Sequence, residues 1–187
     1  TNLQNRDVEY AKKLGYSVKL LATAERTKQE DEDISSLALS LRVEPTLLPT
    51  EHPLAGVNGV NNAIVVEGDP IGEVMFYGPG AGAGPTASAV VADILNIAGV
   101  KLMGDRLEAL DPLLSGSSWR KCHLGDPKEI IQKNYVRLIT EDSPGVIGQI
   151  GTIFGDQLVS IESIVQFDAI NGEAEIVVIT HEVSQGK

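Results

Sequence analysis

The residues best suited to contact a ligand lie between Tyr77 and Asp93, where the sequence reads YGPGAGAGPTASAVVAD. Every second residue of its first half is a glycine: Gly78, Gly80, Gly82 and Gly84. Glycine permits a positive φ and lets the backbone approach a ligand or another segment closely. Pro85 suits the first position of a helix, and Thr86 places a hydroxyl near unpaired backbone N–H groups. An anion would be favoured at such a helix start.

Two interpretations of this glycine loop stay open from the residues alone. One is a phosphate or dinucleotide cradle, and the other is close packing of backbone segments. Gly80 and Gly82 match the beginning of a dinucleotide-binding fingerprint, but Pro85 stands where the third glycine or alanine belongs. No strand ending in an acidic ribose ligand follows at the usual distance, so a complete Rossmann site is not expected here.

The elements around the loop predict an α+β fold, with a mainly antiparallel or mixed sheet and helices on one face. A short helix should end at Gly15, and the helix after the glycine loop should end at Gly99 in a left-handed cap. The expected strands are 16–24, 37–48, 62–67 and 71–77, the last two joined as a hairpin. In the second strand, Leu37, Leu39, Leu41 and Val43 should face inward, and Ala38, Ser40, Arg42 and Glu44 outward.

A second patterned region follows residue 133 and predicts the order β, α, β, β. The expected strands are 135–140, 160–168 and 174–182, and the helix should turn Val146, Ile147, Ile150, Ile153 and Phe154 to one face. Ser143 and Pro144 should form the N-cap and first turn of this helix, with a hairpin turn at Asn171-Gly172. This is a partial ferredoxin-like unit, and we expect its uncovered face and edge to be filled by another chain or by further polypeptide.

Composition narrows the class of protein. The 187 residues are 42% hydrophobic, enough for one large or two small cores, and the net charge of −11 argues against nucleic-acid and anionic-membrane partners. We expect no membrane-spanning run, no export signal and no metal site. A single cysteine, Cys122, suits a reducing compartment, so a cytoplasmic location is expected. Turn-rich composition predicts a linker at 104–133 between domains at 1–103 and 134–187.

The order of these segments resembles a known family. Residues 7–98 resemble the later catalytic region of homoserine dehydrogenase, through AKKLGYSVKLLA, LRVEPTLLP, HPLAGVNGVNNAIVVEGD and GEVMFYGPGAGAGPTASAVVADI. Residues 134–187 resemble a truncated ACT regulatory domain, through NYVRLITEDSPGVIGQIGTIF and VSIESIVQ.

The resemblance implies an NAD- or NADP-dependent oxidoreductase that interconverts L-homoserine and L-aspartate 4-semialdehyde, in the biosynthesis of threonine, methionine and isoleucine. The family's Rossmann domain and catalytic lysine precede the first residue here, so none of Lys12, Lys13 and Lys19 is expected to be catalytic, and this chain alone should be inactive. The cofactor would be bound mainly by that domain, with Gly80, Gly82 and Thr86 as contacts from this chain.

For the ACT-like part, the resemblance implies that an amino acid, threonine, is sensed at an interface between paired domains. Asp142, Gly145, Val146 and Gln166 are the expected effector contacts, although an ordinary helix cap and a dimer strand explain the same residues equally well. The exposed edges make a homodimer the expected assembly. The alternative function is a non-catalytic amino-acid-binding or dimerisation module.

Overall fold

The computed structural model describes residues 3–27, 37–103, 122–170 and 172–186, and the fold is α+β as expected. The chain forms two compact units, which we describe separately. The first unit consists of Thr1–Lys13, Leu21–Glu44 and Cys122–Lys187, and the second of Leu14–Leu20 and Pro45–Lys121. Residues 104–121, most of the expected linker, lie outside the described part of the chain.

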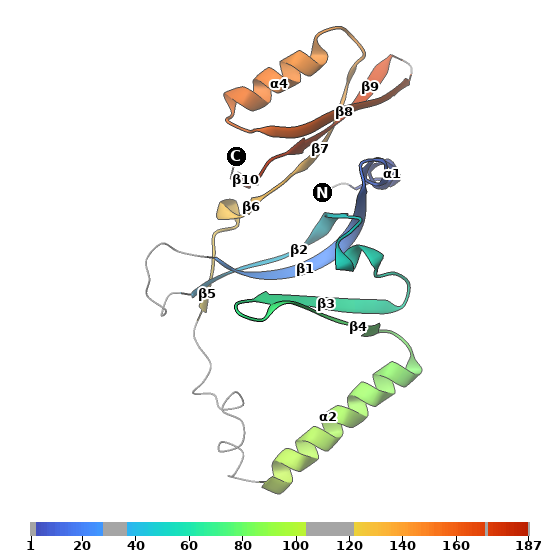
Figure 1. Cartoon of the computed structure of the whole chain (residues 1–187), viewed down its shortest axis with the longest axis vertical. Coiled ribbons are helices and arrows are strands. Elements are labelled where there is room, and N and C mark those ends of the chain that lie inside the picture. Colours follow the sequence, from blue (N-terminus) through green and yellow to red (C-terminus); the bar gives the residue numbers. More distant parts are fainter. Residues whose placement is uncertain (1–2, 28–36, 104–121, 171, 187) are drawn as a thin grey trace. The chain divides into compact units, whose positions relative to one another are not determined.

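The second unit contains the glycine loop. Strands β3 (Asn61–Gly68) and β4 (Gly72–Pro79) pair in antiparallel fashion over their whole length, which confirms the predicted hairpin (Figure 1). A single 3-10 turn, η1 (Pro53–Gly56), precedes them, and the ring Nδ1 of His52 accepts a hydrogen bond from the Leu54 amide at 3.1 Å. His52 therefore caps a turn, which fits a structural role.

Helix α2 (Ala83–Met103) differs from its expected bounds at both ends. It begins two residues before Pro85, and it continues through Gly99, which has no left-handed backbone. A glycine ends a helix only when its φ turns positive, and the apolar residues beyond it favour continued helix here.

The apolar side chains of α2 are exposed, including Val90, Ile94, Leu95 and Leu102. Residues 83–102 are long and apolar enough to cross a membrane by length and composition, contrary to the sequence expectation. Alanine and glycine residues separate the large apolar side chains of this segment, so the sequence shows no continuous strongly apolar run. A core helix of a soluble protein can have the same length and composition.

Strands β1 (Tyr16–Thr27) and β2 (Leu37–Pro49) pass through both units, and β5 (Cys122–Leu124) pairs with β2 in parallel. The alternation predicted along β2 is present, but its direction is reversed. Ala38 and Ser40 are 2% and 6% exposed, whereas Leu41 and Val43 are 56% and 70% exposed. A two-residue period fixes which side chains share a face, but not which face the rest of the chain covers.

The C-terminal part of the first unit has the predicted order β, α, β, β. It consists of β7 (Tyr135–Glu141), α4 (Val146–Asp156), β8 (Ile161–Ile170) and β9 (Glu173–Thr180), and the sheet order is β7-β9-β8 with antiparallel pairing throughout. A second small sheet pairs β6 (Ile131–Gln132) with β10 (Val183–Ser184), next to the turn η5 (Pro127–Glu129).

Helix α4 covers one face of this sheet. Ile150 packs with Ile176 and Val178 of the central strand, and the cluster is completed by Val136, Leu138, Val146, Phe154, Ile161 and Ile164. Ile147 and Ile153 were also expected on this helix face, but they are exposed. The contacts follow the i, i+4, i+8 row of Val146, Ile150 and Phe154, a narrower stripe than predicted.

Helix α1 (Asn5–Lys13) covers the opposite face of the same sheet (Figure 1). Asp7 Oδ1 accepts hydrogen bonds from Arg137 Nε at 2.6 Å and from the Tyr135 hydroxyl at 3.0 Å. Glu175 accepts a hydrogen bond from the Tyr10 hydroxyl at 2.7 Å and pairs with Arg6. We call this set, Asp7, Tyr10, Tyr135, Arg137 and Glu175, the α1 latch.

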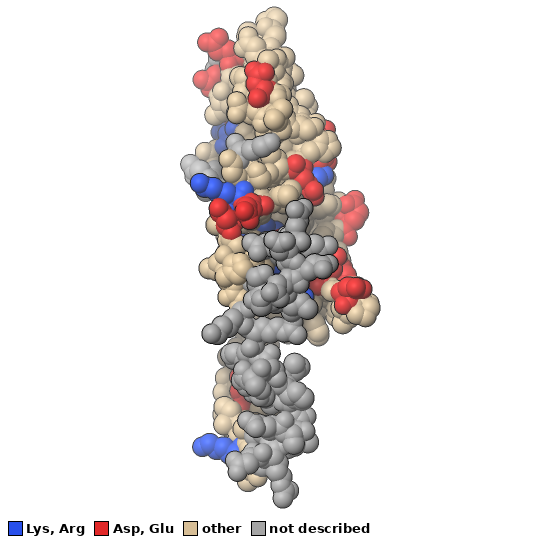
Figure 2. Space-filling model, turned by 90° about the vertical axis from the view of Figure 1, so that its left-hand side faces the viewer, with Lys and Arg blue, Asp and Glu red and all other residues tan. Residues whose placement is uncertain are grey.

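Acidic side chains are spread over the face shown in Figure 2, and the basic side chains described there form no continuous patch. This distribution agrees with the net charge of −11.

Candidate functional site

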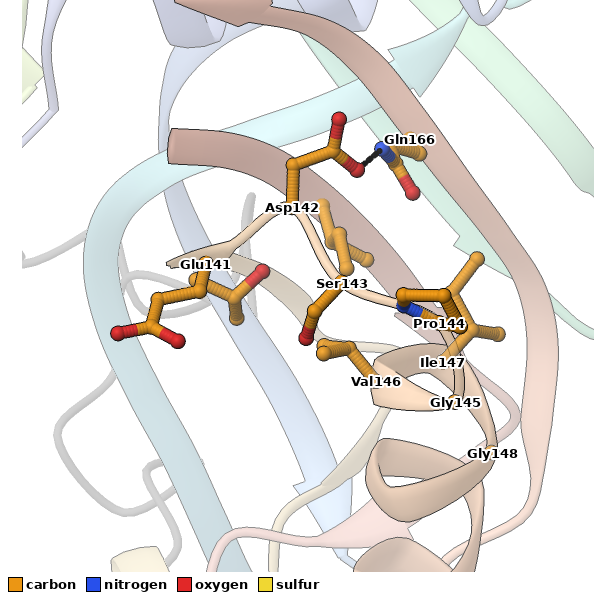
Figure 3. A pocket seen from close by; sticks show the side chains of 11 residues that line it. Glu141, Asp142, Ser143, Pro144, Gly145, Val146, Ile147, Gly148 and Gln166 are labelled. Atoms are coloured by element: carbon orange, nitrogen blue, oxygen red, sulfur yellow. Dashed lines mark hydrogen bonds between the residues drawn. The ribbon is translucent and has the colours of Figure 1, made fainter. Parts of the chain in front are cut away.

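A pocket opens where β7 passes into α4 (Figure 3). Its volume is about 320 Å³, and it is lined by residues 140–148 together with Gln166 of β8 and Ile176 of β9. The loop is held by the Asp142 amide, which donates to the Gly172 carbonyl at 3.0 Å across the sheet end. Four elements of one unit, β7, α4, β8 and β9, therefore build the pocket.

The start of α4 forms one wall of the pocket. Gly145 is the N-cap, with φ of 94°, and no side chain caps the helix. The prediction that Ser143 is the N-cap is therefore wrong. The positive φ at Gly145 lets the chain turn into the helix after Pro144, and such a backbone is available to glycine at little cost. The Val146 amide donates to the Ser143 carbonyl at 3.5 Å, and no side-chain acceptor caps the first turn of the helix within the described residues.

Two side chains meet across the pocket mouth. Gln166 Nε2 donates a hydrogen bond to Asp142 Oδ1 at 3.0 Å, and Figure 3 shows these side chains directed toward each other. Gly145 and Val146 lie in the same pocket, so the structure brings together all four residues expected to contact an effector. Whether they bind one stays a prediction.

Several residues that line the pocket were not predicted as ligand contacts from the sequence, among them Thr140 and Ile176. Thr140 Oγ1 is inaccessible to solvent and has no hydrogen-bond partner among the described residues. A buried hydroxyl without a partner is unfavourable, so a ligand atom that bonded to it would be stabilised. Only the end of the predicted strand hinted at Thr140, because Thr140 is its last residue.

The pocket combines a carboxylate, an amide, a hydroxyl and the N-terminus of an eleven-residue helix. A helix N-terminus favours a carboxylate, and a carboxylate such as that of Asp142 favours an ammonium group. A free α-amino acid has a carboxylate and an ammonium group attached to the same carbon atom, so it matches both features. The volume of about 320 Å³ leaves room for an amino acid.

The glycine loop forms a separate candidate site in the other unit. A Cβ built on Gly80 would lie 1.5 Å from Asn62 Nδ2, so close packing alone explains this glycine. Gly82 has a φ of 125°, and a Cβ there would meet nothing nearer than Pro85 Cδ at 3.5 Å. The Thr86 amide donates to the Gly82 carbonyl at 3.1 Å, inside the first turn of α2. Gly80, Gly82 and Thr86, the three expected cofactor contacts, are all exposed.

Lys19 and Cys122, two other residues considered from the sequence, lie outside both candidate sites. Lys19 Nζ bonds the Val57 carbonyl at 2.5 Å and Asn58 Oδ1 at 2.9 Å, which ties β1 to the turn before β3. Cys122 is a free, exposed thiol. Within the described ranges, no three His, Cys, Asp or Glu side chains gather in a way that could hold a metal ion.

The fold and the pocket define an α+β chain that carries a βαββ domain of the ACT class, and the ACT domain family model matches residues 134–187. The homoserine dehydrogenase family model matches residues 1–95. The chain belongs to the homoserine dehydrogenase family.

Relatives and solved structures agree with this assignment. A homoserine dehydrogenase of Synechocystis is 51% identical over 180 residues, which is 96% of this chain and 41% of that protein. One of Bacillus subtilis is 37% identical over 188 residues, which is 99% of this chain and 40% of that protein. A crystal structure of a homoserine dehydrogenase from Thiobacillus denitrificans has a TM-score of 0.77 and 33% identity, and covers 98% of this chain and 39% of the solved chain. The chain spans about two fifths of the length of the curated relatives it matches.

Proposed function

We propose that the complete polypeptide containing this chain is a homoserine dehydrogenase, which interconverts L-homoserine and L-aspartate 4-semialdehyde with NAD or NADP. The observation that carries this proposal is the match of two family models in succession, over residues 1–95 and 134–187. The proposed enzyme would act in the synthesis of threonine, methionine and isoleucine. We propose that it is a cytoplasmic homodimer.

The test is a comparison of two polypeptides. The complete protein should oxidise L-homoserine with one of the two nicotinamide cofactors, and the 187-residue chain alone should show no turnover. Turnover by the short chain would contradict our view that the catalytic lysine lies outside it. No turnover by the complete protein would favour the alternative, a binding or dimerisation module.

In the proposed enzyme, Gly80, Gly82 and Thr86 contact the nicotinamide cofactor. Gly82 fits this role, since it is exposed with a φ of 125° and the loop leads into the N-terminus of α2. When bound, the oxidised nicotinamide would accept a hydride from homoserine. The loop would contribute position only, by letting backbone atoms approach the cofactor where a side chain would intervene.

Gly84 provides a matched control for the cofactor contact, because it lies two residues away and its Cβ would meet open space. Gly82→Ala should raise the KM for the cofactor at least about tenfold, with a smaller change in the KM for homoserine, because a methyl group would obstruct the approach. Gly84→Ala should leave both constants near their original values. If the two variants had the same KM for the cofactor, Gly82 would serve the geometry of the loop backbone and not a cofactor contact.

We further propose that the pocket at α4 binds threonine as a regulatory effector. The N-terminus of α4 at Gly145 and Val146 would hold the α-carboxylate, and Asp142 would hold the ammonium group, with Gln166 as its neighbour. Thr140 lines the pocket, and its buried Oγ1 lacks a partner within the described chain, so a side-chain shift that exposed it would let it bond the ligand hydroxyl.

Calorimetry with threonine tests this role directly. Threonine should release or absorb heat with the wild-type protein, and Asp142→Ala should weaken binding at least about tenfold, since a charge-assisted hydrogen bond contributes about 1.5–3 kcal/mol. Asp156→Ala, at the other end of α4, is the control and should bind like the wild type. No heat from the wild-type protein at millimolar threonine would remove the threonine assignment.

A further inference from the structure

The pocket and the α1 latch lie on opposite faces of one sheet and use neighbouring residues of the same strands. Gln166 pairs with Ile176 in the β8–β9 ladder, and both side chains line the pocket. The next pair along the ladder is Phe167 with Glu175, and both of these side chains hold α1. Successive side chains of a strand point to opposite faces, so one backbone step separates the pocket from the latch.

The contacts of α1 at this point are tight and specific. The ring of Tyr10 stacks on Phe167, with centroids 3.9 Å apart and planes 9° from parallel. The hydroxyl of the same side chain donates to Glu175 Oε2 at 2.7 Å. Glu175 is 8% exposed, and Ala11 of α1 is fully buried. A shift of this ladder step therefore has to move Tyr10 or break one of its two contacts.

The remaining contacts of the α1 latch bind the first turn of α1 to strand β7. Asp7 is 5% exposed and accepts hydrogen bonds from Arg137 and Tyr135, both on β7. Arg137 also donates to Gln4 Oε1 at 2.9 Å, just before the helix. The first two turns of α1 are thus fastened to the β sheet that bears the pocket.

We propose that the α1 latch and the pocket are energetically coupled through these adjacent ladder pairs, so that pocket occupancy changes how firmly α1 is held. Tyr10 and Glu175 act as positioning residues in this scheme. Helix α1 belongs to the region matched by the homoserine dehydrogenase family model, and the pocket to the ACT region, so the latch joins the two. The identity of the ligand, threonine, rests on the function proposed above. Coupling of binding free energies is reciprocal, so latch changes must alter ligand affinity.

The experiment has two arms and uses the complete polypeptide. In the first, threonine is titrated calorimetrically into the wild type, Tyr10→Phe and the control Glu9→Gln. Tyr10→Phe keeps the ring and removes only the hydroxyl, and Glu9 is an exposed residue of the same helix. In the second, amide hydrogen exchange of residues 5–13 is measured without ligand in the wild type, Gln166→Leu and the control Asp156→Ala, which lies at the far end of α4.

Coupling predicts that Tyr10→Phe changes the threonine Kd at least about threefold, whereas Glu9→Gln does not. It also predicts that Gln166→Leu changes α1 exchange at least about threefold and Asp156→Ala does not. Unchanged α1 exchange in Gln166→Leu would overturn the coupling, whatever ligand binds. An unchanged threonine Kd in Tyr10→Phe would also overturn it, and the effector proposal would stand. If threonine gives no heat but Gln166→Leu alters α1 exchange, the effector proposal fails and the coupling stands.

Discussion

Replacing Asp7 with asparagine should reveal how much free energy the α1 latch contributes. Asp7 Oδ1 accepts hydrogen bonds from Arg137 Nε at 2.6 Å and the Tyr135 hydroxyl, and Oδ2 accepts one from the Gln4 amide at 2.8 Å. Asparagine keeps one acceptor, but its NH₂ group would face either the Gln4 amide or Arg137, both of which are donors. If the NH₂ group faces Arg137, the acceptors left to Arg137 among the described residues are Gln4 Oε1 and, at 3.9 Å, Glu175.

A charge-assisted hydrogen bond contributes about 1.5–3 kcal/mol, and a buried charge that loses its partner costs about 3–5 kcal/mol. Asparagine retains part of the bonding, so we expect Asp7→Asn to lower the free energy of unfolding by about 2–3 kcal/mol at neutral pH. Urea unfolding, followed by the near-ultraviolet circular dichroism of the tyrosines, measures this change. Glu9→Gln removes the same charge from an exposed position of α1 and should cost less than about 0.5 kcal/mol.

The cost of Asp7→Asn should depend on pH in a defined direction. Burial acts to raise the pKa of Asp7, but hydrogen bonds from Arg137, the Gln4 amide and Tyr135 outweigh it, and the pKa is lowered. A depressed pKa in the folded state stabilises the protein above the unfolded value of about 3.9. This stabilisation is lost as the pH falls through the folded pKa. The difference between wild type and Asp7→Asn should therefore shrink below about pH 4.

Two results would refute this reasoning about the latch. One is an Asp7→Asn cost no larger than that of Glu9→Gln, which would mean that the buried network adds nothing over an exposed charge. The other is a cost that does not decrease as the pH falls below about 4, toward the lowered pKa of Asp7 in the folded state.

Two further predictions concern packing. Ile150→Ala should lower the free energy of unfolding, measured by urea denaturation, by about 2–5 kcal/mol, because Ile150 lies in the core and is 7% exposed. Ile153 lies on the same helix but is 62% exposed, so Ile153→Ala should cost under about 1 kcal/mol. Equal costs for the two variants would mean that α4 does not pack as described. Gly80→Ala should lower the thermal midpoint because its Cβ would meet Asn62, and a second change, Asn62→Gly, should restore most of the loss. If the second change restored nothing, the clash with Asn62 would not be the cause.

Local patterns predicted the elements well. The turn residues between β3 and β4 and the alternating strands around α4 specify a hairpin and a βαββ order, since both depend on short-range periodicity and turn chemistry. The effector residues Asp142 and Gln166 were predicted from a helix start and a strand position, and they form a hydrogen bond.

Features set by tertiary packing were not predictable. The covered face of β2 was predicted in reverse, because alternation does not say what lies on either side. Gly99 does not end α2, because a glycine inside an apolar helical run can stay helical. The latch joins Asp7 to Arg137 over 130 positions of sequence, and no spacing rule links residues so far apart. Thr140 entered the pocket only through the fold.

The most direct test of the whole account is an assay of the complete polypeptide with L-homoserine and each nicotinamide cofactor, with and without threonine. We expect cofactor reduction that depends on homoserine, and threonine should inhibit this reaction in the wild type. In Asp142→Ala the rate without threonine should be preserved, and the inhibition should be weaker. Absence of homoserine-dependent reduction with either cofactor would contradict the proposed enzyme. Inhibition of equal strength in wild type and Asp142→Ala would contradict the pocket as the regulatory site.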